Sequence, residues 1–354
     1  MKRIPIFLYI LALTLVLSCT QKNEESGFMI AAWTGADIAE SESEWRSELE
    51  MFSKHGLTDL FLSANPEETE RVVNYASDYG INIHAWVWTL NRPGDSTAAN
   101  NPEWYAVNRN GDNSYDYRAY VDYYQWLSPF SQGAREYIKS TLDTYAKIPG
   151  LHSVHLDYVR YVDVILGADL QPKYDLEQDR QFPEFDYGYH PNARSGFEEL
   201  FGFDPIEMKN PELSMEWLQY RLNAVTTLVN EIAEIVHKEE KLLTAAVFPF
   251  PEMSRQMVRQ DWASWDLDIA LPMLYQNFYR QNLEWIRFAT EQGVRESHDR
   301  FDIVAGLYIP ALTPAQLKTA IQKSKEGGAK GISVFDINAM NQEHWDVVSK
   351  LASN

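Results

Sequence analysis

The sequence predicts an α/β protein built as a single (β/α)8 TIM barrel, and three observations favour this fold. From residue 28 onward, short apolar segments alternate with amphipathic segments of helical period, which is typical of a parallel sheet with helical crossovers. Eight such pairs follow one another, the number that closes a barrel. The chain has 354 residues, of which 45% are hydrophobic, a length that barrels with insertions reach. We therefore expect one barrel domain over residues 28–354.

Four strand–helix pairs are expected in the first part of the chain. The strands share runs of apolar and β-branched residues, and they are predicted at 28–33, 57–63, 81–88 and 152–158. The helices share an apolar face at helical spacing, and they are predicted at 44–55, 66–79, 132–147 and 214–238. Gly56 and Gly80 follow the first two helices and are expected to end them.

The remaining four pairs are closely spaced. The strands are predicted at 242–248, 268–275, 302–309 and 331–336. The helices are predicted at 253–265, 282–292, 314–326 and 342–351. No second domain is expected, because the pattern continues to the end of the sequence.

Two long loops interrupt the pattern, one after the third strand (89–131) and one after the fourth (162–213). The first is rich in Asn, Asp, Gly and Tyr, and its many aromatic residues favour an ordered loop. The second is rich in proline and acidic residues. Loops of this length inside a compact domain are usually functional. We expect both to lie over the end of the barrel at which the strands terminate, where barrels carry their active sites.

The charge of the chain restricts its partners. The net charge is −20, from 31 basic and 51 acidic residues. Such a surface repels nucleic acid, so no nucleic-acid partner is expected, whereas a neutral polymer is not repelled. Aromatic residues make up 13% of the chain, with 11 Trp and 20 Tyr. Aromatic rings stack on the apolar faces of sugar rings, although they also fill protein cores.

The N-terminus has the features of a bacterial lipoprotein signal. A basic start is followed by an apolar run at 6–17 that is too short to span a bilayer, and then by Leu17-Ser18-Cys19, which resembles a lipobox. We expect residues 1–18 to be a signal peptide, Cys19 to be lipidated, and 19–27 to form a polar tether. Thr20 gives no inner-membrane retention signal, so we expect an anchor in the outer membrane of a cell envelope. The alternative is an ordinary secretory signal with an incidental cysteine.

Asp157 is the leading catalytic candidate. It ends the predicted fourth strand, where an apolar run changes into Asp157, Tyr158, Arg160 and Tyr161. Side chains alternate along a strand, so Asp157 shares one face with His155. An aspartate at this position is poorly solvated and must be paired or functional. The alternative is a structural aspartate in an ion pair with Arg160.

Hydrolysis of a glycosidic bond usually requires two carboxyl groups, separated by about 5–9.5 Å. Glu252 follows the fifth strand and Asp336 ends the eighth, so both are candidates for the second group. Asp268 precedes the sixth strand, at the opposite end of the barrel, and is expected to be structural.

Further polar and aromatic residues lie at the strand ends and are expected to hold a substrate. They are Trp33, His84, Trp86, Trp88, Asn91, His155, Arg160, Tyr161, Tyr275, Gln276 and Tyr308. Trp86 and Trp88 are candidates for a platform on which a sugar stacks, although they could equally fill the barrel.

Other chemistries have little support in the sequence. His84, His155 and Asp157 could hold a metal, but no HxH or HExxH spacing is present, and we expect no metal and no cofactor. No GxGxxG, GxxxxGK[ST] or GxSxG motif occurs either. A nucleotide-dependent enzyme and a serine hydrolase are therefore disfavoured.

Five short runs resemble those of the glycosyl hydrolase-like 10 family, barrel proteins of bacterial envelopes. They are His84-Ala85-Trp86, Trp126-Leu127-Ser128-Pro129, the stretch from His155 to Tyr161, Gln260-Asp261-Trp262-Ala263-Ser264-Trp265, and Leu271-Pro272-Met273-Leu274-Tyr275. Their order and spacing cover most of the mature chain. Two departures are Ser128, where asparagine is expected, and the long insertion at 162–213.

The resemblance implies a barrel and a glycosidase, with Asp157 as the catalytic carboxylate. The first hypothesis is a lipid-anchored glycoside hydrolase that cleaves an extracytoplasmic poly- or oligosaccharide, with Asp157 as nucleophile or base and Glu252 or Asp336 as acid. The second is a non-catalytic glycan-binding lipoprotein on the same scaffold. A structure with no second carboxylate near Asp157 would favour the second hypothesis.

Overall fold

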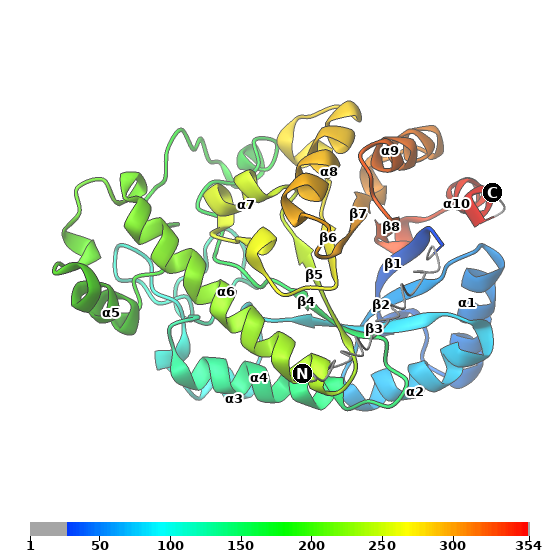
Figure 1. The fold of residues 1–354 in the computed structure, drawn as a ribbon, viewed down its shortest axis with the longest axis horizontal. Helices are drawn as coiled ribbons and strands as arrows, with labels where there is room; N and C mark the ends of the chain where they lie inside the picture. The colour runs from blue at the N-terminus through cyan, green and yellow to red at the C-terminus, as the bar shows by residue number, and fades with distance from the viewer. Residues whose placement is uncertain (1–26, 353–354) are drawn as a thin grey trace, which may run out of the picture.

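The computed structural model describes residues 27–352, and its strands form a closed parallel barrel in chain order, β1 to β8 (Figure 1). The predicted TIM-barrel fold is confirmed. The strands are β1 (Met29–Gly35), β2 (Asp59–Ser63), β3 (Asn82–Trp88), β4 (Ser153–Asp157), β5 (Leu242–Val247), β6 (Ile269–Pro272), β7 (Asp302–Tyr308) and β8 (Gly331–Phe335).

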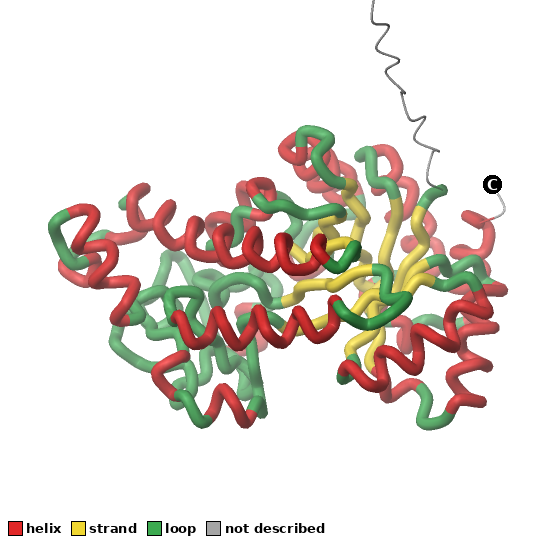
Figure 2. The backbone as a smooth tube through the Cα atoms, turned by 60° about the horizontal axis from the view of Figure 1, so that its bottom comes forward, coloured by secondary structure: helices red, strands yellow, loops and turns green. Residues whose placement is uncertain are grey.

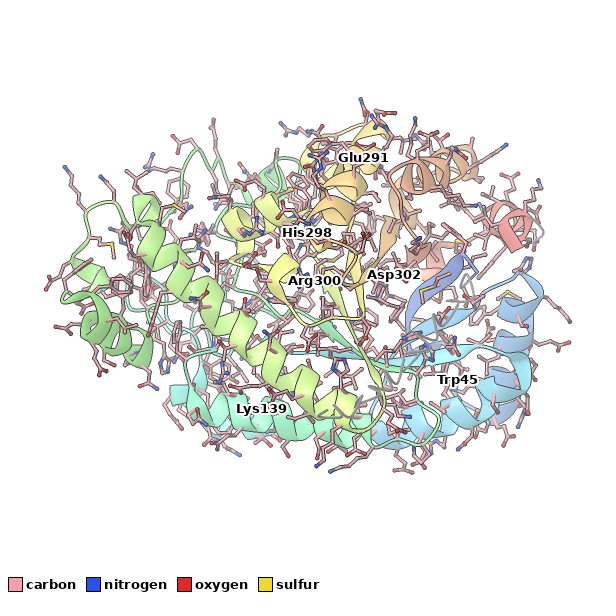
Figure 3. All side chains as sticks on the ribbon, in the orientation of Figure 1. Trp45, Lys139, Glu291, His298, Arg300 and Asp302 are labelled. Carbon is pink, nitrogen blue, oxygen red and sulfur yellow. The ribbon has the colours of Figure 1, made fainter. Side chains whose placement is uncertain are left out.

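The helices lie around the barrel and in the two insertions. They are α1 (Glu42–Lys54), α2 (Pro66–Ala76), α3 (Ser96–Ala99), α4 (Gln132–Ala146), α5 (Pro191–Phe201), α6 (Met215–Lys238), α7 (Pro251–Val258), α8 (Glu284–Ser297), α9 (Pro314–Glu326) and α10 (Gln342–Ala352). The first helix begins where Ser41 and Glu44 form a capping box. An ion pair links the neighbouring helices α4 and α6: Lys139, labelled in Figure 3, lies 2.8 Å from Glu231.

The strand register sets the height of each side chain in the barrel. Across β3 and β4, His84 pairs with Ser153, Trp86 with His155, and Trp88 with Asp157. Trp88 and Asp157 therefore stand at the C-terminal end of the barrel, whereas His84 lies lower, nearer the N-terminal ends of the strands. Alternation along the strands separates two apolar layers. The larger packs between strands and helices, and a smaller cluster that includes Trp33, Phe61 and Leu271 fills the lumen.

The two insertions lie together on one side of the strands, where loops gather in Figure 2. The second insertion contains α5, a helix that the sequence analysis did not predict. Pro191 occupies its first position and Gly202, at φ 82°, follows its last residue, so the usual start and stop signals of a helix were present. Figure 1 shows α5 at the far end of this extension, beyond α6.

A buried ionic cluster ties the second insertion to the barrel helices. Asp186 of the insertion accepts a hydrogen bond from Arg221 of α6 at 2.6 Å and lies 3.5 Å from Arg259, just after α7. All three side chains are buried. Burial alone would raise the pKa of Asp186, but the two guanidinium groups outweigh it and lower the pKa. Asp186 is therefore the charged centre of this junction.

Several predicted elements were wrong in their bounds; the helix predicted at 282–292, for example, spans Glu284–Ser297. The helix predicted at 253–265 ends at Val258, because Arg259 adopts a left-handed conformation with φ 51°. The remainder holds a short 3-10 turn at Trp262–Ser264, and Trp262 and Trp265 are buried. The sixth strand ends at Pro272, three residues before the predicted end.

Within residues 27–352, no helix combines the length and the apolarity that crossing a bilayer requires. The predicted signal peptide at 1–18, the lipidation site Cys19 and the tether up to residue 26 lie outside the described residues.

Candidate functional site

A cavity of about 360 Å³ opens at the C-terminal ends of the strands. Its floor is built by the barrel itself, from residues at the ends of six strands. They are Trp33, Trp86, Asp157, Met273, Tyr308 and Phe335. The volume falls in the range of small-molecule sites, and the lining is mostly aromatic, as is usual for such sites.

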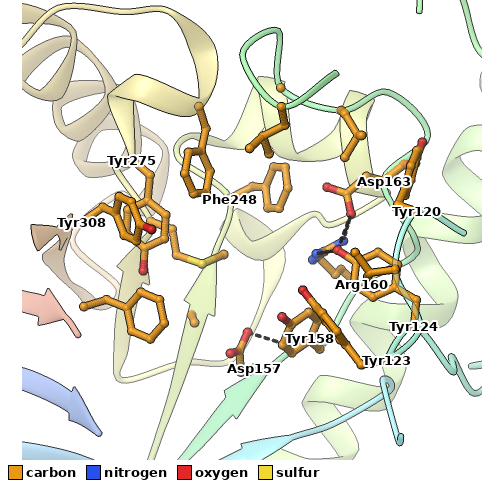
Figure 4. Close-up of a pocket in the computed structure, with 18 of the residues that line it drawn as sticks. Tyr120, Tyr123, Tyr124, Asp157, Tyr158, Arg160, Asp163, Phe248, Tyr275 and Tyr308 are labelled. Atoms are coloured by element: carbon orange, nitrogen blue, oxygen red, sulfur yellow. Dashed lines mark hydrogen bonds and ion pairs between the residues drawn. The ribbon is translucent and has the colours of Figure 1, made fainter. Parts of the chain in front are cut away.

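The walls of the cavity come from the loops. The first insertion contributes Tyr120, Tyr123 and Tyr124, and the second contributes Asp163 and Lys173 among others. Figure 4 shows Arg160 and Asp163 on one side of the cavity, Tyr275 and Tyr308 on the opposite side, and Asp157 between them at the base. Both insertions thus meet over the strand ends, as their length led us to expect.

Asp157 lies at the base of the cavity with only 9% of its surface exposed. Its Oδ2 accepts a hydrogen bond from the Trp86 indole Nε1 at 3.0 Å, and its Oδ1 accepts one from the Tyr158 backbone N–H at 2.6 Å. Burial raises the pKa of Asp157, and the two hydrogen bonds and the nearby charge of Arg160 offset this only in part. The carboxyl group is therefore biased towards its protonated form compared with an aspartate in water.

Arg160 does not form the ion pair with Asp157 that was considered as an alternative. Its Nη1 donates instead to Asp163 Oδ2 at 3.0 Å and to the Tyr161 carbonyl at 2.9 Å. The guanidinium group also lies within 5.4 Å of the ring centroids of Trp126, Tyr158 and Phe248. Among the described residues, Asp157 thus has no direct cationic partner, which leaves its carboxyl group available for chemistry.

Asp163 is a second carboxylate in the cavity lining, and the sequence analysis missed it. Its Oδ2 accepts hydrogen bonds from Arg160 and from the Tyr124 hydroxyl at 3.1 Å, and its backbone carbonyl accepts one from Tyr120 at 2.7 Å. The only sequence signal was its position three residues after Arg160, inside a segment treated as an insertion.

The two predicted partner carboxylates lie outside the cavity lining. Glu252 is the second residue of α7, where its side chain is exposed to solvent. Asp336 is half-buried and caps a 3-10 turn, accepting a hydrogen bond from the Ala339 N–H at 3.1 Å. Asp336 is close enough to Tyr275 to affect the pKa of its phenol, but the structure does not bring it into the cavity beside Asp157.

Six of the predicted substrate-binding residues line the cavity. They are Trp33, Trp86, Trp88, Arg160, Tyr275 and Tyr308. Trp88 packs against Tyr158 and Tyr123, with ring centroids 4.6 and 6.0 Å apart. On the other side the Tyr275 and Phe335 rings are nearly parallel, at an interplanar angle of 13°. The cavity thus has aromatic rings on two sides, and such rings can pack against the C–H faces of a sugar.

The other five predicted substrate-binding residues are buried and do not line the cavity. They are His84, Asn91, His155, Tyr161 and Gln276. His84 and His155 point into the lumen, where other side chains satisfy their ring nitrogens. The Asn91 side chain accepts a hydrogen bond from the Gln125 N–H. Strand alternation placed both histidines on the correct face, but at a level below the cavity.

Within residues 27–352, no group of three or more His, Cys, Asp or Glu side chains is arranged to hold a metal ion. The three residues considered for such a site form hydrogen bonds with three different partners. His84 bonds to Asp59, His155 to Trp33, and Asp157 to Trp86.

The buried carboxyl group and the aromatic cavity at the strand ends lie where enzymes of the (β/α)8 barrel class carry their active sites. The chain belongs to the glycosyl hydrolase-like 10 family, whose family model matches residues 64–325. The resemblance that the five sequence runs indicated is therefore confirmed.

Several solved structures with the same fold are glycosidases of low sequence identity. The glycoside hydrolase domain of PgaB (BpsB) from Bordetella bronchiseptica matches with a TM-score of 0.67 at 13% identity, over 92% of this chain and 99% of that one. The catalytic domain of a β-amylase from Paenibacillus polymyxa gives 0.59 at 10% identity, over 92% and 97%. A β-galactosidase from Marinomonas ef1 gives 0.65 at 12% identity, over 92% and 59%. Comparison with curated protein sequences gives no match.

Proposed function

We propose that this protein is a glycoside hydrolase that cleaves a poly- or oligosaccharide, with Asp157 as its proton donor. The observation that carries this proposal is the buried carboxyl group of Asp157, whose pKa burial raises, at the base of an aromatic cavity. A carboxyl group with a raised pKa is suited to protonating a leaving oxygen. Membership of the glycosyl hydrolase-like 10 family supports the same reaction class.

Asp163 is the best-placed second carboxylate. It lies in the cavity lining, and Arg160 and Tyr124 both donate hydrogen bonds to its Oδ2. In the reaction, Asp157 gives its proton to the glycosidic oxygen as the bond to the anomeric carbon breaks. Asp163 takes a proton from the water that attacks that carbon, or attacks it directly before water releases the sugar. This assignment replaces Glu252 and Asp336, and it makes Asp157 the acid where the sequence had suggested a base or nucleophile.

The substrate is proposed to lie outside the cytoplasm. The support for this is the N-terminal sequence, in which Cys19 closes a lipobox-like run and would carry a lipid anchor in the outer membrane. The net charge of −20 agrees with a carbohydrate substrate and disfavours nucleic acid.

One observation favours the second hypothesis, a non-catalytic glycan-binding lipoprotein. Asp163 is already engaged by two donors, and a carboxylate held in this way can serve as an acceptor for sugar hydroxyl groups without taking part in chemistry. In that case aromatic contacts govern binding and Asp157 contributes little.

A glycan panel with matched variants separates the two functions. The mature protein is incubated with diverse poly- and oligosaccharides, and released reducing ends are measured. Asp157→Asn should retain its circular dichroism spectrum and lose about 10²–10⁴-fold in turnover, the usual contribution of a general acid. Asp179→Asn, at an exposed aspartate in the second insertion, is the control and should be fully active. Undiminished turnover in folded Asp157→Asn would contradict the proposal.

A further inference from the structure

A continuous chain of buried hydrogen bonds runs through the lumen beneath the cavity. It connects a carboxylate at the N-terminal end of β2 to an indole in the cavity floor. Its members are Asp59, His84, Ser153, Thr244, His155 and Trp33. Each is at most 3% exposed, so water does not compete for these bonds.

The hydrogen bond from Trp33, at the cavity end of this hydrogen-bond chain, fixes the tautomer of His155. The Trp33 indole nitrogen can only donate a hydrogen bond, and it lies 3.0 Å from His155 Nε2. That nitrogen must therefore accept. Burial lowers the pKa of His155 well below its ordinary value, so the ring is neutral and its proton is on Nδ1. His155 Nδ1 then donates to Thr244 Oγ1 at 2.8 Å.

The remaining hydrogen bonds run from Thr244 to the Asp59 carboxylate, and their donors are assigned in the same manner. Having accepted from His155, the Thr244 hydroxyl donates to Ser153 Oγ at 3.3 Å, and Ser153 donates to His84 Nδ1 at 2.6 Å. His84 Nε2 then donates to Asp59 Oδ1 at 2.9 Å. Every donor in this series of hydrogen bonds faces an acceptor, and each donates in the direction from Trp33 towards Asp59.

Asp59 is suited to be the terminal acceptor. Burial alone would raise its pKa, but His84, Thr58 and Asn82 all donate hydrogen bonds to the carboxylate and lower the pKa. A charged carboxylate at the bottom of the barrel thus orders the protons of the groups above it.

We propose that Asp59, His84, Thr244 and His155 are positioning residues that fix the indole of Trp33 as the floor of the cavity. The indole N–H is held downwards in the lumen, so the part of Trp33 that lines the cavity is apolar ring surface. A side-chain carbon on Gly306 would lie only 3.1 Å from Trp33 Cη2, so the ring is also confined from the β7 side.

The functional part of this inference rests on the proposed glycosidase activity. The Trp33 ring offers no hydrogen-bond donor to the cavity, so this part of the floor accepts the apolar C–H face of a pyranose and disfavours a substrate that places a polar group there. The two histidines therefore act on the substrate through Trp33, where the sequence had suggested direct contact.

The test uses a matched pair of substitutions at Thr244, which is two hydrogen bonds away from Trp33. Thr244→Val keeps the shape of the side chain and removes the hydroxyl, whereas Thr244→Ser keeps the hydroxyl. The full mature chain is labelled with 5-fluorotryptophan, and the ¹⁹F signal of Trp33 is assigned with a Trp33→Phe variant. We expect Thr244→Val to shift or broaden the Trp33 signal and Thr244→Ser to preserve it. An unchanged Trp33 signal in Thr244→Val overturns the proposal.

A second pair covers the case in which Thr244→Val does not fold. In His155→Gln the amide can accept from Trp33 and donate to Thr244, whereas His155→Leu can do neither. The Trp33 signal should stay near its native position only in His155→Gln, and equal displacement in both variants overturns the proposal. These spectra need no substrate, so they stand even if no glycan is cleaved. On a glycan that is cleaved, Thr244→Val should raise KM with little change in kcat, and Thr244→Ser should restore it.

Discussion

Trp86 and Asp157 are joined across the adjacent strands β3 and β4 by a hydrogen bond of 3.0 Å from the indole nitrogen to the carboxyl group. The bond fixes the direction of the Asp157 side chain at the base of the cavity. It also stabilises the charged form of Asp157 against burial, so Trp86 sets how acidic this group is. Trp33, the other tryptophan in the floor, turns its N–H away from the cavity, so the two indoles have different tasks.

Activity should depend on the protonation of Asp157. A proton donor works below its pKa, so turnover should be present at lower pH and be lost as the pH rises through the raised pKa of Asp157. Trp86→Phe removes a donor to the charged form, so the pKa rises further and the alkaline limb of the pH–rate profile moves to higher pH. Trp104→Phe, outside the cavity, should leave the profile unchanged. A limb that moves to lower pH in Trp86→Phe contradicts the assignment of Asp157 as the acid.

The role of Asp163 can be separated from its contribution to stability. Asp163→Asn leaves the buried Arg160 without its counter-ion, which should cost about 3–5 kcal/mol in urea unfolding. The double variant Arg160→Met/Asp163→Asn removes the unpaired charge and should recover part of that loss. If Asp163 takes part in catalysis, neither variant regains turnover. Recovery of activity together with stability in the double variant would show that Asp163 is only structural.

Trp88 should contribute to substrate affinity more than to the rate of cleavage. Its ring packs against Tyr123 and Tyr158 at the cavity wall, away from the hydrogen bonds of Asp157. Trp88→Ala should weaken binding of an oligosaccharide by about 0.5–1.5 kcal/mol, measured by calorimetry with the inactive Asp157→Asn protein. Phe288→Ala, at an exposed aromatic residue on α8 outside the cavity, is the control and should bind normally. Equal affinities in the two variants would remove Trp88 from the site.

The second insertion should depend on Asp186 for its attachment. Asp186→Asn leaves Arg221 and Arg259 buried without a carboxylate, and the free energy of unfolding should fall by about 3–5 kcal/mol at neutral pH. Because the pKa of Asp186 is lowered in the folded state, its stabilisation is present above the unfolded pKa and is lost as the pH falls through the folded pKa. The difference between the native protein and Asp186→Asn should therefore shrink in acid. A constant difference down to low pH argues against this linkage.

The predicted lipid anchor is tested at Cys19. In cells, the native chain should fractionate with membranes and incorporate labelled palmitate, and Cys19→Ala should lose the label. Retention of the label in Cys19→Ala would show that the lipobox-like run is not the lipidation site.

The placement of Asp157 and Trp86 could be predicted because the order of the strands along the chain and the alternation of side chains within a strand can be read from the sequence. Asp163 could not, because its place in the site depends on Tyr124, which lies 39 residues away. His84 and His155 were assigned to the correct face, but their depth follows from the register between strands, which the pattern within one strand does not contain. The early end of α7 depends on the left-handed conformation of Arg259, for which no glycine gave a signal.

The cavity draws its proposed proton donor and most of its enclosure from separate parts of the chain. Asp157 and Trp86 belong to the strands, whereas much of the wall around them belongs to two insertions that contribute no strand to the barrel. Changes of length or composition in 89–131 and 162–213 can therefore alter which saccharide fits without disturbing the register that aligns the carboxyl group. Relatives of this protein can accordingly diverge in specificity while Asp157 keeps its place, and exchanging these insertions between relatives, with Asp163 retained, is a direct route to new specificities.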